Sequence, residues 1–333
     1  MKRILAGVIF SIPCLVVIIV LLSSADEIFA QYLKNFKSDS ISFLSPAFLL
    51  QWGGGLLAGF YLFGLVYLFF QPQDDIAIDY NLKFNDLVII NTVLFSVLFI
   101  YSLFTVIQFK YLFAGGGELP YGLSYTYYAR RGFFELLFLT GINILAILFV
   151  VECTREETGF WANLTKVFCC CLCFITFILL ISSYYRMWLY NDDSGLTRLR
   201  FLVFGFLIFE GLGLICTFIY ILKPYFNIFT TYLLIGLTYY LLLNLVPMDS
   251  IVAKSQIDRY LVNGKGDIEY VLSLSSDAAG QISRLLTHKN RDVVNKAKYY
   301  FAKQKESYDR FDGWQKFNLS EAKCKRIADQ EGL

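Results

Sequence analysis

The stretch FLVFGFLIFEGLGLICTFIYIL, residues 201–222, decides the fold because it is long and apolar enough to cross a bilayer. Glu210 is its only acidic or basic side chain. A helix of this length rises about 33 Å, and the hydrocarbon core of a bilayer is about 30 Å thick. Comparable apolar runs recur along the chain. We therefore expect about seven spans, at residues 4–22, 47–70, 87–109, 132–151, 162–183, 201–222 and 228–246.

The composition also indicates lipid as the main solvent. Hydrophobic residues make up 57% of the chain and charged residues 17%, whereas about a quarter of a soluble domain is charged. The formal net charge of +2 does not favour nucleic acid as a partner. We therefore predict an all-α, polytopic transmembrane helix bundle in the inner or plasma membrane, with the lipid bilayer as its first partner.

The pattern changes after the last apolar run. Residues 248–333 mix acidic and basic side chains and contain no stretch that could span a membrane. Gly264 predicts the end of one short helix, Ser276 the start of another, and Asn318 or Ser320 the cap of a last one. The sequence therefore predicts two domains, a transmembrane helical bundle over residues 1–247 and a small soluble helical tail over residues 248–333.

Basic residues at the ends of the spans predict the orientation, because cytoplasmic loops carry an excess of Lys and Arg. The tail side has the larger share, namely Lys34, Lys37, Lys110, Arg130, Arg131, Arg186, Arg198 and Arg200. On the opposite side, basic residues are diluted by aspartates in the connector after the second span. We predict a cytoplasmic tail, although Lys2 and Arg3 argue for the reverse.

The first apolar run has an alternative interpretation as a secretory signal peptide. Lys2 and Arg3 precede it, and Ser23-Ser24-Ala25 resembles a small-x-small cleavage site. The run is about 19 residues long, which is closer to a spanning helix than to the apolar core of a signal peptide, about 7–15 residues. We therefore expect this run to be retained as the first span.

Several stretches share a distinctive pattern of aromatic, glycine and charged residues. They are QxxYLFAGG (108–116) with YARRGFFEL (128–136), RMxLY (186–190) with GLTxxR (195–200), DIEYVLSLSSDA (267–278), and SADxxFA (24–30). These motifs and their spacing resemble a bacterial membrane family known as domain of unknown function 4173, which is related to the 4153 family. The resemblance implies a polytopic membrane protein whose relatives carry further membrane helices ahead of this segment. It implies no particular activity.

Glu210 is the first candidate functional residue. An acidic side chain at the centre of a spanning helix costs about 2.5–3.5 kcal/mol on insertion scales, so it needs a reason to be there. Lipid favours the neutral carboxyl unless a cation reaches it from another helix. Glu210 could serve as a proton or cation relay, or as a site for a substrate ammonium group. Alternatively, it is a hydrogen-bonded acid that fixes helix packing.

Arg130, Arg131 and Glu135 form the second candidate site. Arg131 and Glu135 are four residues apart, so on a helix they share a face and can pair. A glycine-rich turn precedes them, and Arg binds phosphate through two parallel hydrogen bonds. The cluster could therefore bind a lipid phosphate or an anionic substrate. The alternative is interfacial anchoring with a structural ion pair.

Arg186, Tyr190 and Arg200 form the third candidate site, around the short connector Asn191-Asp192-Asp193. The aspartates of this connector could neutralise the two arginines. A folded connector without a ligand explains the same pattern equally well. Polar amides within the spans are expected to join helices by hydrogen bonds; they are Asn91, Gln108, Asn143 and Asn244.

The sequence offers few residues that could bind a metal ion or a cofactor. His288 is the sole histidine and lies in the tail, so histidine-based metal sites and Ser-His or Cys-His catalysis inside the membrane lack their parts. The cysteines between residues 169 and 173 have no second Cys pair to complete four ligands, which favours apolar packing. No phosphate-binding or dinucleotide-binding loop is present. We predict no metal, no cofactor and no catalytic residue.

Three classes of function remain open. The first is a non-enzymatic membrane component, such as a sensor, scaffold or partner subunit, whose tail docks a cytoplasmic protein. The second is a transporter or channel-like protein that uses Glu210 or the cluster of Arg130, Arg131 and Glu135. The third is a membrane-embedded enzyme acting on lipid or glycan. The sequence favours the first class and leans against an enzyme, and it leaves the oligomeric state open.

Overall fold

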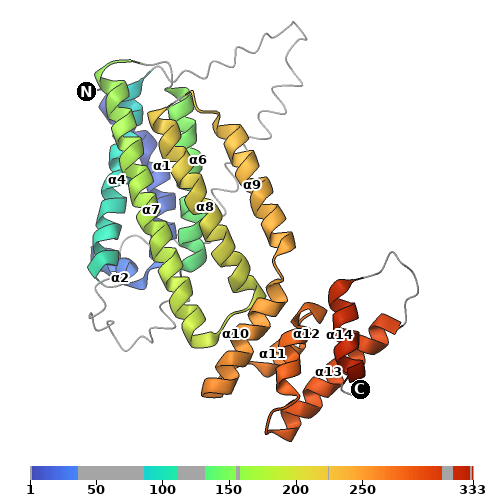
Figure 1. The fold of residues 1–333 in the computed structure, drawn as a ribbon. Coiled ribbons are helices and arrows are strands. Elements are labelled where there is room, and N and C mark those ends of the chain that lie inside the picture. The colour runs from blue at the N-terminus through green and yellow to red at the C-terminus, as the bar shows by residue number, and fades with distance from the viewer. Residues whose placement is uncertain are drawn as a thin grey trace, which may run out of the picture. The chain divides into compact units, whose positions relative to one another are not determined.

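The computed structural model describes residues 2–36, 86–110, 132–154, 158–223, 225–309, 318–330 and 332. Within these ranges every regular element is helical (Figure 1). The predicted all-α polytopic fold with a helical C-terminal region is therefore confirmed. The span predicted at 47–70 and the side chains of Arg130 and Arg131 lie outside the described residues.

Six described helices are long and apolar enough to cross a membrane. They are α1 (Lys2–Ala25), α4 (Leu87–Gln108), α6 (Phe133–Cys153), α7 (Phe160–Ser194), α8 (Arg198–Leu222) and α9 (Ile228–Leu245). Each coincides with one of the expected spans. Helix α7 is longer than expected, because no Pro or Gly interrupts it before Gly195, whose left-handed φ of 79° ends it.

The described chain separates into two compact units, of which the first comprises Met1–Arg186 and Glu210–Thr231. In this unit α1 and α4 pack side by side and run in the same direction. Arg3 pairs with Asp86 at their beginnings, 3.1 Å apart. At their other ends, Gln108 donates to Asp26 at 2.7 Å.

A short helix that the sequence analysis did not predict, α2 (Glu27–Phe36), follows α1. Asp26 separates the two helices, and its Oδ1 accepts hydrogen bonds from the backbone N–H groups of Ile28 at 2.9 Å and Phe29 at 3.1 Å. This is the arrangement of a helix N-cap. The ring of Phe29 meets that of Phe104 edge to face, 5.2 Å between centroids. Asp26 and Phe29 thus fix where α2 begins and what it packs against.

The second compact unit comprises Met187–Phe209 and Tyr232–Leu333. Its C-terminal helices are α10 (Met248–Asn263), α11 (Ile268–Leu272), α12 (Ala279–Ile282), α13 (Arg291–Asp309) and α14 (Leu319–Gln330), with 3-10 turns η3 (Ser276–Ala278) and η4 (Ser283–Leu285). Gly264 ends α10 with a φ of 70°, and the side chain of Asn318 accepts from the Ser320 N–H, as expected.

The tail has its own hydrophobic core, and the α7–α8 connector contributes to it. Fully buried side chains include Val252, Ile282 and Phe301, and Leu196 and Phe201 pack against this core. The compact unit therefore groups residues of the connector with the tail. The division into domains at residue 247 stays a prediction.

Candidate functional site

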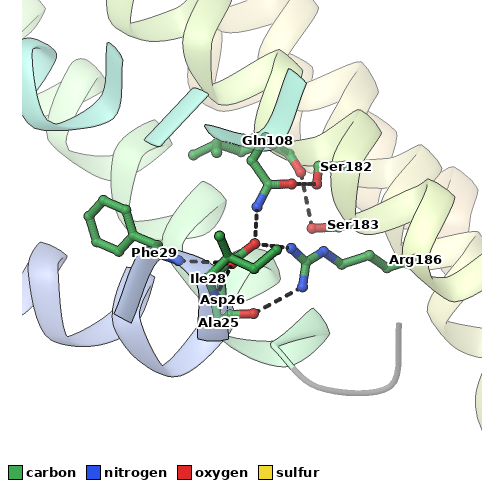
Figure 2. A network of polar contacts seen from close by, with 9 residues as sticks. Ala25, Asp26, Ile28, Phe29, Gln108, Ser182, Ser183 and Arg186 are labelled. Carbon is green, nitrogen blue, oxygen red and sulfur yellow. Dashed lines mark hydrogen bonds and ion pairs between the residues drawn. The ribbon is translucent and has the colours of Figure 1, made fainter. Parts of the chain in front are cut away.

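A buried polar network joins α7 to the junction of α1 and α2 (Figure 2). Arg186 Nη2 lies 2.7 Å from Asp26 Oδ2, and both side chains are 0% exposed. Arg186 Nη1 donates to the carbonyl oxygen of Ala25 at 2.9 Å. Gln108 Nε2 donates to the same Asp26 oxygen, and Ser182 donates to Gln108 Oε1 at 2.8 Å. Side chains from α4 and α7 therefore meet at one carboxylate.

The carboxylate of Asp26 is saturated with hydrogen bonds. Oδ1 accepts from two backbone N–H groups, and Oδ2 accepts from Arg186 and Gln108. An ionised carboxylate offers about four acceptor positions, so the network occupies all of them. Buried charges are tolerated only when they are paired and hydrogen-bonded. The arrangement fits a fixed structural contact between helices better than a site that exchanges a ligand. We call this contact, made by Asp26, Arg186 and Gln108, the Asp26 joint.

Glu135 lies close to this joint, in the first turn of α6. Its Oε1 accepts a hydrogen bond from Ser24 Oγ at 3.2 Å. Gly132 caps the same helix with a φ of 81°, and a Cβ placed on it would lie 1.8 Å from the Ala25 carbonyl oxygen. Residues 24–26 thus make successive contacts with α6 and α7. Of the second predicted site, only Glu135 belongs to the described residues.

Glu210 is buried in α8 and faces α6. Thr140 Oγ1 lies 2.6 Å from Glu210 Oε2 and 2.7 Å from the carbonyl oxygen of Leu137. A hydroxyl has a single hydrogen to donate. Both contacts are full hydrogen bonds when Glu210 is protonated, donates to Thr140, and Thr140 donates to Leu137. The ion pairs formed among the described residues do not include Glu210.

Further polar contacts line the interior between α4, α6 and α7. Tyr101 donates to Asn143 Oδ1 at 2.8 Å, and Asn143 Nδ2 donates to Thr176 at 3.0 Å. Nearer the start of α4, Asn91 donates to the carbonyl oxygen of Trp161 at 3.0 Å. These amides join helices, as expected. Asn244 differs, because it donates to Tyr240 of its own helix at 2.7 Å.

The third predicted site divides between two environments. Arg186 belongs to the Asp26 joint, whereas Tyr190 and Arg200 lie in the second unit. The guanidinium of Arg200 lies 3.8 Å from the centroid of the Tyr190 ring and donates to the carbonyl oxygen of Gly195. Arg200 and Tyr190 thus brace the connector that they flank. Arg186 forms an ion pair with Asp26.

Two of the pockets that described residues line lie in the first unit. One has a volume of about 560 Å³ and is lined by Glu152, Tyr220 and residues 225–229, with Leu148. The other, of about 590 Å³, is an apolar groove between α4 and α7 with Phe99 and Phe174 in its lining. Neither pocket is lined by Glu135, Glu210 or Arg186.

Sequence reasoning did not select Asp26 as a site residue, although it carries the joint. The available signals were an aspartate directly after an apolar run and its place in the SADxxFA motif. Neither indicates a partner that lies 160 positions away in α7. Glu152 was also missed, because it stands at the end of a span where acidic residues are common.

A family model described as "Domain of unknown function (DUF4153)" matches residues 1–285. Comparison with curated proteins and with solved structures gives no match. The family match covers the spans and the first part of the tail. The chain therefore belongs to this family, and its apolar helices are those of an integral membrane protein.

Proposed function

We propose that this DUF4153 protein is a non-enzymatic membrane component, a sensor, scaffold or partner subunit, whose helical tail docks a cytoplasmic protein. The closer assignment to the related 4173 family, the bacterial origin and the inner or plasma membrane are parts of the same proposal. The proposal rests on the ion pair and the hydrogen bonds that attach the tail to the connector between α7 and α8.

An ion pair between half-exposed Arg198 and buried Asp249 provides the first attachment of the tail to this connector. Arg198, at the start of α8, donates through Nε and Nη2 to both carboxylate oxygens of Asp249 in α10. Ser275 adds a backbone hydrogen bond to Asp249 Oδ2 at 2.9 Å. The Asp249 side chain is 8% exposed. A two-point Arg–carboxylate contact fixes orientation as well as distance.

The end of α7 provides the second fastening. Arg259 of α10 donates to the carbonyl oxygens of Asn191, Asp192 and Asp193. These carbonyls belong to the last turn of α7, where a cation is favoured by the helix dipole. Gln256 Nε2 also donates to the Leu196 carbonyl oxygen at 2.8 Å.

These contacts support a signalling or scaffolding role because they make the connector and the tail move together. A ligand or lipid that shifts the end of α7 or the start of α8 would reposition α10. Conversely, a protein bound to the tail would bias the same helix ends, since coupling of binding free energies is reciprocal. A tail on a loose linker would transmit neither effect.

The test is affinity purification of the full chain in a gentle detergent, followed by rebinding of the purified partner. Removing the whole tail would uncover Leu196 and Phe201, so point variants are preferable. Tyr299 of α13 is 72% exposed and follows exposed Lys298. Tyr299→Ala with Lys298→Glu should lower retention of the partner about tenfold or more, as expected for changes to interface anchors.

The matched control is Phe160→Leu, which changes a residue of similar exposure at the start of α7. It should leave partner retention unchanged. The proposal fails if no protein rebinds to the purified full chain, or if the tail variant and the control retain it equally.

A second candidate function is a proton-coupled transporter, and the contacts of Glu210 favour it. A protonated acid with one hydrogen-bond partner in the bundle interior can release and regain a proton, which the saturated Asp26 cannot do as readily. In reconstituted vesicles with a trapped pH-sensitive dye, an imposed pH gradient should drive proton entry that Glu210→Gln abolishes. Equal entry rates for both proteins would remove this candidate.

A membrane-embedded enzyme, the third class, would need two acids or an acid and a base at one cavity. Of the two pockets above, the first includes a single acid, Glu152, and the apolar groove includes none. These pockets therefore give that class no support.

A further inference from the structure

We propose that one exposed face of α13 binds an acidic segment of the cytoplasmic protein that the tail docks. This basic face of α13 is defined by six exposed residues, Arg291, Asn295, Lys298, Tyr299, Ala302 and Lys303. The site rests on the proposed docking function, to which it adds the chemistry of the partner. All six residues belong to the second compact unit.

The face follows from the pattern of burial along α13. Helix α13 packs against α11, η4 and α14 of the tail. Its residues that are buried in the core of the tail recur with the helical period; they are Val293, Ala297, Tyr300 and Phe301. On the other side, Arg291 and Lys298 are two turns apart, and Lys303 is one turn after Tyr299. From Arg291 to Lys303 the helix rises about 18 Å.

The basic side chains of α13 fall into two classes. Lys296 and Lys305 each lie within ion-pair distance of a tail carboxylate, at 3.2 Å and 2.7 Å. Arg291, Lys298 and Lys303 form no ion pair or hydrogen bond with the described part of the chain. These three exposed cations are therefore available to a partner.

The described acidic side chains of α13 do not neutralise these cations. Asp292 Oδ2 lies 3.4 Å from Lys296 Nζ. Glu306, towards the C-terminal end of the helix, is also engaged within the chain. The basic face thus has three positive charges with which no described acid pairs.

Tyr299 gives the face an aromatic centre. Its side chain is 72% exposed, and it lies between Lys298 and Lys303 along the face. Tyr and Arg are enriched among the residues that contribute most to protein interfaces. Ala302 is small and exposed, so a partner can approach the ring closely. A ring flanked by cations fits a partner that combines acidic groups with apolar surface.

An acidic protein segment fits this face better than an anionic membrane surface does. Recognition of anionic lipid typically takes clusters of about 4–8 Lys or Arg, whereas the face has three open cations and one large apolar ring. Charge complementarity of this size steers and orients a protein partner. An extended segment of about five or six residues spans the length of the face.

The test uses the full chain in an uncharged detergent. The probe is a fluorescently labelled peptide of about six glutamates, a length matched to the face, and its glutamine counterpart is the reference. Fluorescence anisotropy should show that the glutamate peptide binds at least tenfold more tightly. Raising the salt concentration from about 50 mM to about 500 mM should weaken this binding, because exposed charges are screened.

Lys298→Gln combined with Lys303→Gln should weaken binding of the glutamate peptide about five- to tenfold, as expected for the loss of two exposed charge contacts. The matched control is Lys254→Gln combined with Lys265→Gln, which removes the same charge from two other exposed lysines of the tail. The control should bind the peptide as the wild type does.

The same variants are then compared for retention of the captured cytoplasmic protein. Loss of both the protein and the peptide in the Lys298 and Lys303 variant, with the control unchanged, supports the acidic-segment site. A protein retained equally by variant and control overturns this site and leaves the docking function standing. Peptide binding that requires Lys298 and Lys303, without any captured protein, keeps this site and removes the docking function. Equal peptide binding by variant and control, or none, overturns the site.

Phosphatidylglycerol vesicles test the membrane alternative. The full chain is reconstituted in phosphatidylcholine nanodiscs, and its sedimentation with the vesicles is measured for the wild type and both variants. Vesicle binding that requires Lys298 and Lys303, when the glutamate peptide does not bind, would assign the face to anionic lipid and overturn the proposal.

Discussion

Arg186 Nη2 donates to Asp26 Oδ2 at 2.7 Å, and neither side chain is exposed to solvent. The two residues are 160 positions apart in the sequence. Their contact closes the first unit by tying the α1–α2 junction to α7. Gln108 donates to the same carboxylate oxygen, so loss of the Asp26 carboxylate would remove a hydrogen-bond partner from Gln108 as well as from Arg186.

Removing one charge of this pair should destabilise the bundle strongly. Asp26→Asn or Arg186→Gln leaves the other charge buried and uncompensated, which costs about 3–5 kcal/mol in proteins. Each variant should lower the unfolding temperature in detergent, measured by fluorescence-detected size exclusion. Combining the two changes should restore part of the loss, because no unpaired charge then remains. Single variants with wild-type unfolding temperatures would show that the Asp26–Arg186 pair does not stabilise the bundle.

Gly132→Ala should disrupt the start of α6. The residue has a φ of 81°, and a Cβ on it would lie 1.8 Å from the Ala25 carbonyl oxygen, which also accepts from Arg186. Left-handed backbone alone costs an L-residue roughly 1–2 kcal/mol, and the clash adds to that. We expect low yield of folded protein. Gly159→Ala, whose φ is also positive but whose Cβ would meet nothing within 4 Å, is the control and should be milder.

The tail should lose stability in acid through Asp249. Burial raises the pKa of this carboxyl, but hydrogen bonds from Arg198 and Ser275 outweigh it and set the pKa at about 2, against an ordinary 3.8. Since the folded pKa is the lower one, ionised Asp249 stabilises the fold above about pH 4. That contribution is lost as the pH falls through about 2.

Pepsin cleavage of the full chain between about pH 4 and pH 2 measures this effect, because pepsin cuts the opened tail. Cleavage of the wild type should accelerate over that window. Asp249→Asn should be cleaved faster throughout and with a flatter pH profile. Asp258→Asn removes a surface pair with Arg284 and should keep the wild-type profile. A steep profile in Asp249→Asn would assign the acid sensitivity to another group.

Glu210→Gln should leave the bundle folded, because a protonated acid and an amide can both donate to Thr140. We expect a change in unfolding free energy within about 0.5 kcal/mol. Thr140→Val, which removes the hydroxyl, should cost about 0.6–1.7 kcal/mol, the range of hydrogen bonds between membrane helices. Infrared difference spectra should show a protonated carboxyl band that the Gln variant lacks. A large loss of stability in Glu210→Gln would indicate a charged Glu210.

The positions of the six described spans could be predicted from the sequence, because a length of about 20 apolar residues is a local property that lipid imposes. The residues that end the tail helix α10 and begin α14, Gly264 and Asn318, could also be predicted, since capping is local. The exception was α2, a ten-residue amphipathic helix. This helix is too short to be a span, and the sequence analysis did not distinguish it from the segment that follows the first span.

The partners of the candidate residues could not be predicted, because they depend on contacts between distant helices. Arg186 and Asp26 illustrate this, as does the placement of Glu210 beside Thr140. Tyr190 and Arg200, which flank the α7–α8 connector, contact each other locally, and the sequence analysis allowed for that arrangement. Which of these contacts serves function stays a prediction.

The separation between Asp26 and Arg186 also has a consequence for biosynthesis. At about 5–20 residues per second, roughly 8–32 seconds pass between synthesis of the aspartate and synthesis of its arginine. During that interval Asp26 needs water, headgroups or the insertion machinery as its surroundings. Nascent chains arrested ahead of α7 should therefore remain open at this junction, and the N-terminal helices would acquire their final packing only after α7 has entered the membrane.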